Sequence, residues 1–281
     1  MSKCYIMCMN QGRKESEQRM DAALKKSLKA GEVKVGIMLS ELYVPNVTRI
    51  LAKCGYDFIL VDCEHGYFDM TQVANLISVA RGAEIPVLIR VTQPSRTCVT
   101  KYLDMGANGI LLSDVGGTEE AKKLVDLCKY APEGKRGLST FRAHTDYSKG
   151  KLADVMQTAN DGIIVVCQIE SPEAVKEING ITGIEGIDGV LIGPNDLSQH
   201  MGIPGDYAHP LMHRAIEKVA ESARTNGKWS GIITANGHLL SYAARQGMTC
   251  YSVGSELNAI YDGGIAQLDT AKDTITGERK L

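Results

Sequence analysis

The feature that most limits the fold of this chain is a strict alternation of short apolar runs with stretches of helical pattern. Two of the runs, residues 163–169 and 189–192, are β-branched and lack polar–apolar alternation, which is typical of buried parallel strands. The predicted strands cover residues 33–39, 57–61, 86–91, 109–112, 163–169, 189–192, 228–234 and 250–253. Eight strands, each followed by a helix, predict an α/β protein with a (β/α)8 barrel, the TIM barrel.

An open, doubly wound sheet is the alternative fold, but it needs fewer strands and a switch point in strand order. No G-x-G-x-x-G sequence follows the first predicted strand, which disfavours a dinucleotide-binding fold. Glycines before several strands, as in G-A-N-G at 106–109, are typical of helix C-caps that lead into strands. We therefore expect an N-terminal arm and helix over residues 1–31 and a catalytic barrel over residues 32–281.

Composition excludes several classes of function. The 281 residues, 44% of them hydrophobic, can bury a large core, and a formal net charge of −2 argues against nucleic-acid or acidic-membrane partners. No apolar run reaches the roughly 18 residues of a membrane span, and the first residues lack a signal-peptide pattern. Most of the eight cysteines fall within predicted strands and helices. We therefore expect a cytoplasmic protein with free thiols rather than disulfides.

Acidic side chains follow the fifth and sixth predicted strands. The fifth ends in Q-I-E at 168–170, and G-P-N-D at 193–196 follows the sixth. Because parallel strands end at the same edge, Glu170 and Asp196 are expected to face each other there. Two carboxylates with room for water suit Mg²⁺ or Mn²⁺, and also Co²⁺, better than zinc. The simpler alternative is that each carboxylate only caps the helix that follows it.

Further polar side chains end the second and third predicted strands. Asp62 lies three residues before His65 in V-D-C-E-H, and the third strand ends in Arg90. In a barrel these strand ends converge on one mouth. An imidazole oriented by Asp62 is a usable general base, and a guanidinium fits a carboxylate or an oxyanion. Beside a divalent cation, these groups suit stabilisation of an enolate from a 2-oxo acid, although a structural histidine and a structural ion pair are the simpler interpretations.

Seven motifs in a fixed order carry a family resemblance. They are F-I-L-V-D-C-E-H at 58–65, P-V-L-I-R-V at 86–91, K-Y-L-D-M-G-A-N-G-I at 101–110, G-K-R-G at 134–137, V-C-Q-I-E-S at 166–171, G-V-L-I-G-P-N-D-L-S at 189–198 and I-T-A-N at 233–236. Together they resemble the HpcH/HpaI family of class II, pyruvate-type aldolases over about residues 32–265. The resemblance implies a metal-dependent carbon–carbon lyase that cleaves a 4-hydroxy-2-oxo acid to pyruvate and an aldehyde through pyruvate enolate.

The resemblance also implies roles for individual residues. Glu170 and Asp196 match the metal ligands, Arg90 matches the arginine that binds the 2-oxo group, and His65 with Asp62 matches the dyad that moves protons through a water. Substrate contacts fall to residues at the fifth and sixth strand ends, namely Gln168, Gly193, Pro194 and Asn195. Members of the family are typically hexamers, trimers of dimers with the last helix exchanged between neighbours. The matching aspartate at position 104 is expected at the barrel mouth.

Departures from the family pattern concern the second substrate. Ser113 and Asp114 replace a proline and an apolar residue, and Met38 stands where an aromatic residue is common. The segment 137–147 is also more polar than is typical of the family. These changes leave an oxaloacetate decarboxylase or an enolate-using carbon–carbon bond-forming synthase as the alternative function, and a non-catalytic binding or assembly barrel as a third.

We hypothesise that three of the unusual polar residues, Asp114, Arg142 and His144, line the half of the site that receives the electrophile. The alternative is that they are solvated loop residues or face a neighbouring subunit.

Overall fold

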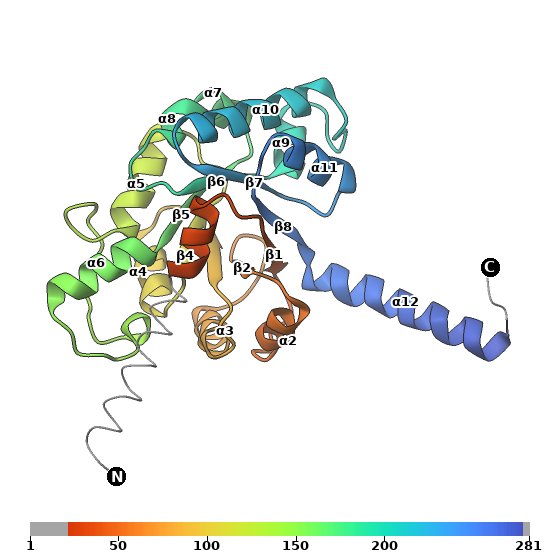
Figure 1. Ribbon diagram of the computed structural model, residues 1–281, viewed down its shortest axis with the longest axis horizontal. Coiled ribbons are helices and arrows are strands. Elements are labelled where there is room, and N and C mark those ends of the chain that lie inside the picture. Colours follow the sequence, from red (N-terminus) through yellow and green to blue (C-terminus); the bar gives the residue numbers. More distant parts are fainter. Residues whose placement is uncertain (1–21, 278–281) are drawn as a thin grey trace, which may run out of the picture.

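The computed structural model describes residues 22–277 and contains a closed barrel of eight parallel strands (Figure 1). The strands lie side by side in sequence order, and the last pairs with the first to close the ring. They are β1 (Lys34–Leu39), β2 (Phe58–Asp62), β3 (Val87–Val91), β4 (Gly109–Leu112), β5 (Ile164–Ile169), β6 (Gly189–Ile192), β7 (Trp229–Ile233) and β8 (Cys250–Ser255). The predicted (β/α)8 barrel is confirmed, and the predicted bounds of β4 and β6 coincide with the observed ones.

Helices surround the barrel and connect successive strands (Figure 1). They are α2 (Val47–Cys54), α3 (Met70–Gly82), α4 (Arg96–Asp104), α5 (Thr118–Cys128), α6 (Leu152–Gly162), α7 (Pro172–Lys176), α8 (Ile178–Thr182), α9 (Pro194–His200), α10 (Pro210–Thr225), α11 (Gly237–Arg245) and α12 (Glu256–Thr276), with a 3₁₀ turn η1 at Ala143–Thr145. The connections between strands carry the chain back from the C-terminal strand ends, here called the mouth, to the N-terminal strand ends, here called the base, and α12 follows the last strand. None of the described helices is both long and apolar enough to cross a bilayer. The cytoplasmic location stays a prediction.

Large apolar side chains from the strands fill the base half of the barrel interior. Trp229 at the start of β7 packs there. A Cβ at Gly189 would lie 2.2 Å from the indole ring, so a glycine is required beside the tryptophan. Helical residues 22–29 close the base and bury Leu24 and Leu28 against the same cluster. Burial of each leucine contributes about 1.5–3 kcal/mol.

A second apolar layer joins the outer faces of the strands to the helices. It includes Val73, Leu76, Ile77 and Ala80 of α3, which recur three or four residues apart and so lie on one helix face. The described cysteines are all free, as expected; Cys4 and Cys8 lie outside the described residues, as does most of the predicted N-terminal arm. Two apolar layers, one inside the barrel at its base and one between the strands and the helices, thus form the core.

Candidate active site at the barrel mouth

Arg90 at the end of β3 is held by two carboxylates from the end of β2. Its Nε donates to Asp62 Oδ1 at 2.9 Å and its Nη2 to Asp62 Oδ2 at 2.5 Å. Its Nη1 lies 3.1 Å from Glu64 Oε2. The register places Asp62 directly beside Arg90 on neighbouring strands, so this pairing follows from the barrel itself. The guanidinium is therefore fixed in one orientation at the mouth.

The Asp62 carboxylate binds the guanidinium of Arg90 rather than the imidazole of His65. Besides Arg90, the Asp62 carboxylate accepts from the backbone N–H groups of Glu64 and His65. Burial opposes ionisation, but the hydrogen bonds and charge of Arg90 hold the pKa of Asp62 below its usual range. The His65 side chain is exposed. The prediction that Asp62 orients the His65 ring is corrected: both carboxylate oxygens are committed elsewhere, and Asp62 reaches only the His65 backbone.

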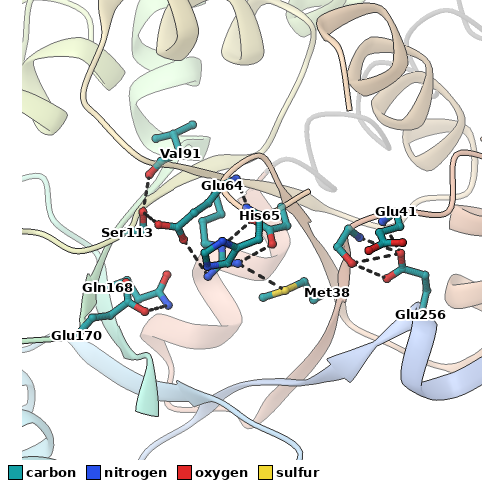
Figure 2. Close-up of polar contacts among 12 residues, drawn as sticks. Met38, Glu41, Glu64, His65, Val91, Ser113, Gln168, Glu170 and Glu256 are labelled. Carbon is teal, nitrogen blue, oxygen red and sulfur yellow. Dashed lines mark hydrogen bonds and ion pairs between the residues drawn. The ribbon is translucent and has the colours of Figure 1, made fainter. Parts of the chain in front are cut away.

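Ser113, which follows β4, adds a contact that the sequence did not predict. Its hydroxyl donates to Glu64 Oε1 at 2.8 Å, and its oxygen also lies 3.2 Å from the Val91 carbonyl oxygen (Figure 2). Met38 Sδ lies 3.9 Å from Arg90 Nη2. Two of the positions that depart from the family pattern therefore contact Arg90 or its partner Glu64. Glu64 was visible in the motif V-D-C-E-H, but only the folded register shows that it pairs with Arg90.

Glu170 and Gln168 extend the site from β5. Gln168 Nε2 donates to Glu170 Oε1 at 2.7 Å (Figure 2). The backbone N–H of Asp114 donates to Glu170 Oε2 at 2.9 Å. A Cβ at Gly193 would lie 2.0 Å from Glu170 Oε1, so only glycine lets the sixth strand end approach this closely. Burial, with smaller contributions from Glu64 and Asp196, raises the pKa of Glu170 to about 7.

These residues fit a hard divalent cation. Gln168 Oε1 is buried without a hydrogen-bond partner in the described chain, and the charge of Asp196 acts on Glu170. The described residues contain no group of three or more His, Cys, Asp or Glu side chains placed to hold a metal. The donor set is therefore two carboxylates and an amide oxygen, which leaves ligand positions for water or substrate. That is the chemistry Mg²⁺ and Mn²⁺ prefer, not that of a closed zinc site.

The first turn of α9 leaves backbone donors near Asp196. Gly193 N–H donates to the Ile169 carbonyl, and Pro194 has no N–H group. The helix has no side-chain N-cap, so the N–H groups of Asn195 and Asp196 are the orphan donors of its first turn. Asn195 Oδ1 accepts from the Tyr207 hydroxyl at 2.5 Å. Of the three predicted substrate contacts here, only Asn195 keeps a free backbone donor.

Comparisons with known proteins agree with this geometry. The family model HpcH/HpaI aldolase/citrate lyase matches residues 36–262. The chain belongs to this family. It is 34% identical over 236 residues to a 4-hydroxy-2-oxo-heptane-1,7-dioate aldolase of Escherichia coli, which covers 84% of this chain and 89% of the relative. The family and its aldolases confirm the prediction of a carbon–carbon lyase.

Two solved structures of the family are similar to this HpcH/HpaI chain. An HpcH/HpaI aldolase from Desulfitobacterium hafniense DCB-2 has a TM-score of 0.84 and 35% identity, covering 89% of this chain and 96% of its own. The citrate synthase SbnG has a TM-score of 0.79 and 31% identity, covering 89% of this chain and 98% of its own. The fold thus serves relatives named for bond cleavage and for bond formation.

Some residues predicted for the mouth of this family member lie elsewhere. Asp104 is the last residue of α4, and Arg142 and His144 lie at η1, close to Asp104. Because α4 runs back along the barrel, its C-terminal end lies at the base. The prediction that Arg142 and His144 line the electrophile half of their own barrel is therefore wrong, as is the placement of Asp104 at its mouth. Asp114 is exposed and does lie at the mouth, where its backbone N–H donates to Glu170.

Proposed function

We propose that this protein is a divalent-metal-dependent aldolase that cleaves a 4-hydroxy-2-oxo acid to pyruvate and an aldehyde. The observation that carries the proposal is the oxygen-donor set of Glu170, Asp196 and the unpartnered Gln168 Oε1, beside the fixed guanidinium of Arg90. The mouth holds four carboxylates, those of Asp62, Glu64, Glu170 and Asp196, and one arginine, and this excess of negative charge favours a cation. The aldolase names of the relatives support the substrate class.

The side chains of this chain have distinct tasks in the cleavage. Glu170, Asp196 and Gln168 Oε1 would hold Mg²⁺ or Mn²⁺, which supplies a Lewis acid for the 2-oxo group. Arg90, locked by Asp62 and Glu64, places its positive charge where negative charge develops on the enolate oxygen. The backbone N–H groups of Asn195 and Asp196 orient the substrate carboxylate.

Proton transfer is assigned to His65. Its side chain is exposed at the mouth, where a water can join it to the 4-hydroxyl group of the substrate. Removal of the hydroxyl proton lets the C3–C4 bond break: the aldehyde forms at C4 and the bonding electrons move to the enolate. Protonation of C3 then yields pyruvate. Asp62 contributes through Arg90, not through the histidine ring.

The proposal is tested by pyruvate release coupled to lactate dehydrogenase, with 4-hydroxy-2-oxo-heptane-1,7-dioate as substrate. We expect turnover with Mg²⁺ or Mn²⁺, loss of turnover after chelation with EDTA, and recovery on adding the metal back. Turnover that is insensitive to chelation would contradict the metal-dependent mechanism. Failure on every 4-hydroxy-2-oxo acid tested would remove the aldolase assignment.

The alternative is use of the same enolate for oxaloacetate decarboxylation or for carbon–carbon bond formation. Similarity to the citrate synthase SbnG supports it, as does the change at Ser113, whose hydroxyl contacts Glu64 beside Arg90. Oxaloacetate is the discriminating substrate, because its decarboxylation needs the enolate but no aldehyde site. Pyruvate release from oxaloacetate alone, with none from the 4-hydroxy-2-oxo acid, would favour the alternative.

We also propose an oligomer in which α12 packs on a neighbouring subunit, with the hexamer as the expected state. This helix extends away from the barrel (Figure 1). Its exposed apolar side chains are Leu257, Ile260, Tyr261, Ile265, Leu268 and Ile275. An apolar face of this size favours a protein partner. Analytical ultracentrifugation of the full chain and of Ile260→Asp/Leu268→Asp tests the proposal: a monomeric wild type would contradict it.

A further inference from the structure

A second polar site lies at the base of the barrel, at the opposite end of the strands from the mouth. A cavity of about 210 Å³ opens there between the residues that lead into β4 and β5 and the segment from η1 to α6. We call it the base pocket. Its floor is formed by Gly106, Ala107 and Asn108 before β4 and by Gly162 and Ile163 before β5. Residues of the proposed catalytic reaction do not line it.

Arg136 supplies a buried positive charge to the base pocket. Its side chain is 0% exposed, and its Nη2 donates to Asp104 Oδ1 at 2.8 Å. Its guanidinium carbon lies 4.6 Å from the centre of the Tyr130 ring. Its Nε and Nη1 have no hydrogen-bond partner in the described chain. Because unpaired N–H groups of a buried charged side chain are costly, this arginine has capacity for an acceptor that the chain does not provide.

His144 lines the same pocket and has the same capacity. Its side chain is 8% exposed, and neither ring nitrogen has a partner within hydrogen-bond geometry in the described chain, although the Asp104 backbone is close enough to act on the pKa of the ring. Asp104 Oδ1 lies 3.9 Å from Nδ1, beyond hydrogen-bonding distance. Burial, together with the charge of Arg136, lowers the pKa of His144 to about 4. The neutral ring can donate one hydrogen bond to a ligand.

The remaining lining of the pocket combines positive charge with an apolar wall. Lys149 and Lys151 stand at the rim with Arg81, opposed by Asp146 and Asp154. With Arg136, cationic side chains therefore outnumber carboxylates among the lining residues. The apolar wall consists of Leu103, Ala107, Val155, Ala159 and Ile163. A ligand that satisfies both parts carries one anionic group and a short hydrocarbon chain.

We propose that the base pocket binds a small organic carboxylate, with the carboxylate on Arg136 and His144 and the hydrocarbon chain against α6. The site is independent of the aldolase proposal, because it shares no residue with the mouth. A buried, charged hydrogen-bond donor favours a carboxylate over its uncharged amide. A volume of about 210 Å³ suits a ligand of a few carbon atoms.

Butyrate is the probe, and butyramide is its uncharged match. Binding to the full-length protein is measured by ligand-observed NMR with oxalate and Mg²⁺ present to fill the mouth. We expect butyrate to bind at least about tenfold more tightly than butyramide, since a charge-assisted hydrogen bond separates them. Two variants are compared with the wild type: Arg136→Gln removes the charge, and Ala159→Leu fills the cavity from α6 while keeping a good helix-forming residue. Each substitution should weaken the binding of butyrate at least about tenfold.

Thermal unfolding followed by circular dichroism shows whether each variant is folded. If Arg136→Gln fails to fold, Ala159→Leu and the comparison of butyrate with butyramide still test whether the base pocket binds a carboxylate. A crystal structure with butyrate should show its carboxylate beside Arg136 and His144. The proposal is overturned if the wild type does not bind butyrate, if butyramide binds equally well, if Ala159→Leu binds butyrate like the wild type, or if butyrate occupies only the mouth.

Discussion

Two buried arginines at opposite ends of the barrel have different surroundings. Arg90 at the mouth has contacts to Asp62 and Glu64 at all three of its nitrogens. Arg136 at the base has one ion pair, to Asp104, and two nitrogens without a hydrogen-bond partner in the described chain. The residue type is the same, so the number of neighbouring carboxylates sets what each arginine can still bind.

The two ends consequently favour ligands of opposite charge. At the mouth, carboxylates exceed the single arginine, and burial raises the pKa of Glu170 to about 7, so a cation would stabilise the ionised form. At the base, cationic side chains outnumber carboxylates among the pocket residues, and a neutral His144 completes the lining. Because the strands separate the two groups, each end can be altered without rebuilding the other.

The largest effect is expected from Glu170→Gln. The substitution keeps the shape but removes one of two carboxylates from the proposed cation site, which costs several kcal/mol of transition-state stabilisation, or at least about a 10³-fold loss in kcat/KM. Mn²⁺ binding followed by electron paramagnetic resonance should weaken in parallel. Glu173→Gln, on the exposed face of α7, is the matched control and should leave both measurements unchanged. Unaltered Mn²⁺ affinity in Glu170→Gln would place the metal elsewhere.

A pair of lysine substitutions compares the two arginines directly. Arg90→Lys keeps the charge but loses the two-point contact with Asp62, and we expect kcat/KM to fall about 10²-fold. Arg136→Lys, made in the same way at the base, should leave kcat/KM within about twofold, as expected for a residue outside the reacting centre. The test is steady-state kinetics on both variants, and urea unfolding confirms that each variant is folded. Equal losses would show that the two ends are coupled.

The barrel was predictable from the sequence because the patterns that specify its strands and helices are local. Buried apolar runs, helix-ending glycines and short connections each act over a few residues, and together they specify which strand follows which. The same logic brought Glu170, Asp196 and Arg90 to one end, since strand ends share an edge. Residues that end a strand were therefore placed correctly from their position alone.

The errors concern side chains whose partners are set by three-dimensional register. Asp62 is three residues from His65 in sequence but directly beside Arg90 in the sheet, and the nearer partner in space forms the ion pair. His144 lies in a connection without a strand to fix its direction, so no periodic signal indicated that it returns to the base. A pattern of polar residues there could indicate a site, but not which end of the barrel contains it.

Acid stability tests the environment of His144. Its pKa is lowered from about 6.5 to about 4, chiefly by burial, so the unfolded chain binds more protons between these values. This group therefore contributes stability above pH of about 6.5 that is lost as the pH falls toward about 4, on the order of 1–3 kcal/mol. In urea unfolding, wild type should lose more stability than His144→Asn across this range. Parallel pH profiles would show that the ring is hydrated in the folded protein.

The smallest effect is expected from Ser113→Ala. The Ser113 hydroxyl donates to Glu64, whose other oxygen faces Arg90, so the substitution releases one constraint on the guanidinium without removing a proposed catalytic group. The loss of one such hydrogen bond is worth about 1 kcal/mol, which corresponds to about a fivefold fall in kcat/KM. Thr100→Ala, on α4, is the matched control, because the Thr100 hydroxyl has no hydrogen-bond partner in the described residues. If Ser113→Ala changes the ratio of activities on oxaloacetate and on the 4-hydroxy-2-oxo acid, the hydroxyl selects the reaction as well as supporting Arg90. If the ratio is constant while both activities fall, its role is limited to positioning Arg90 through Glu64.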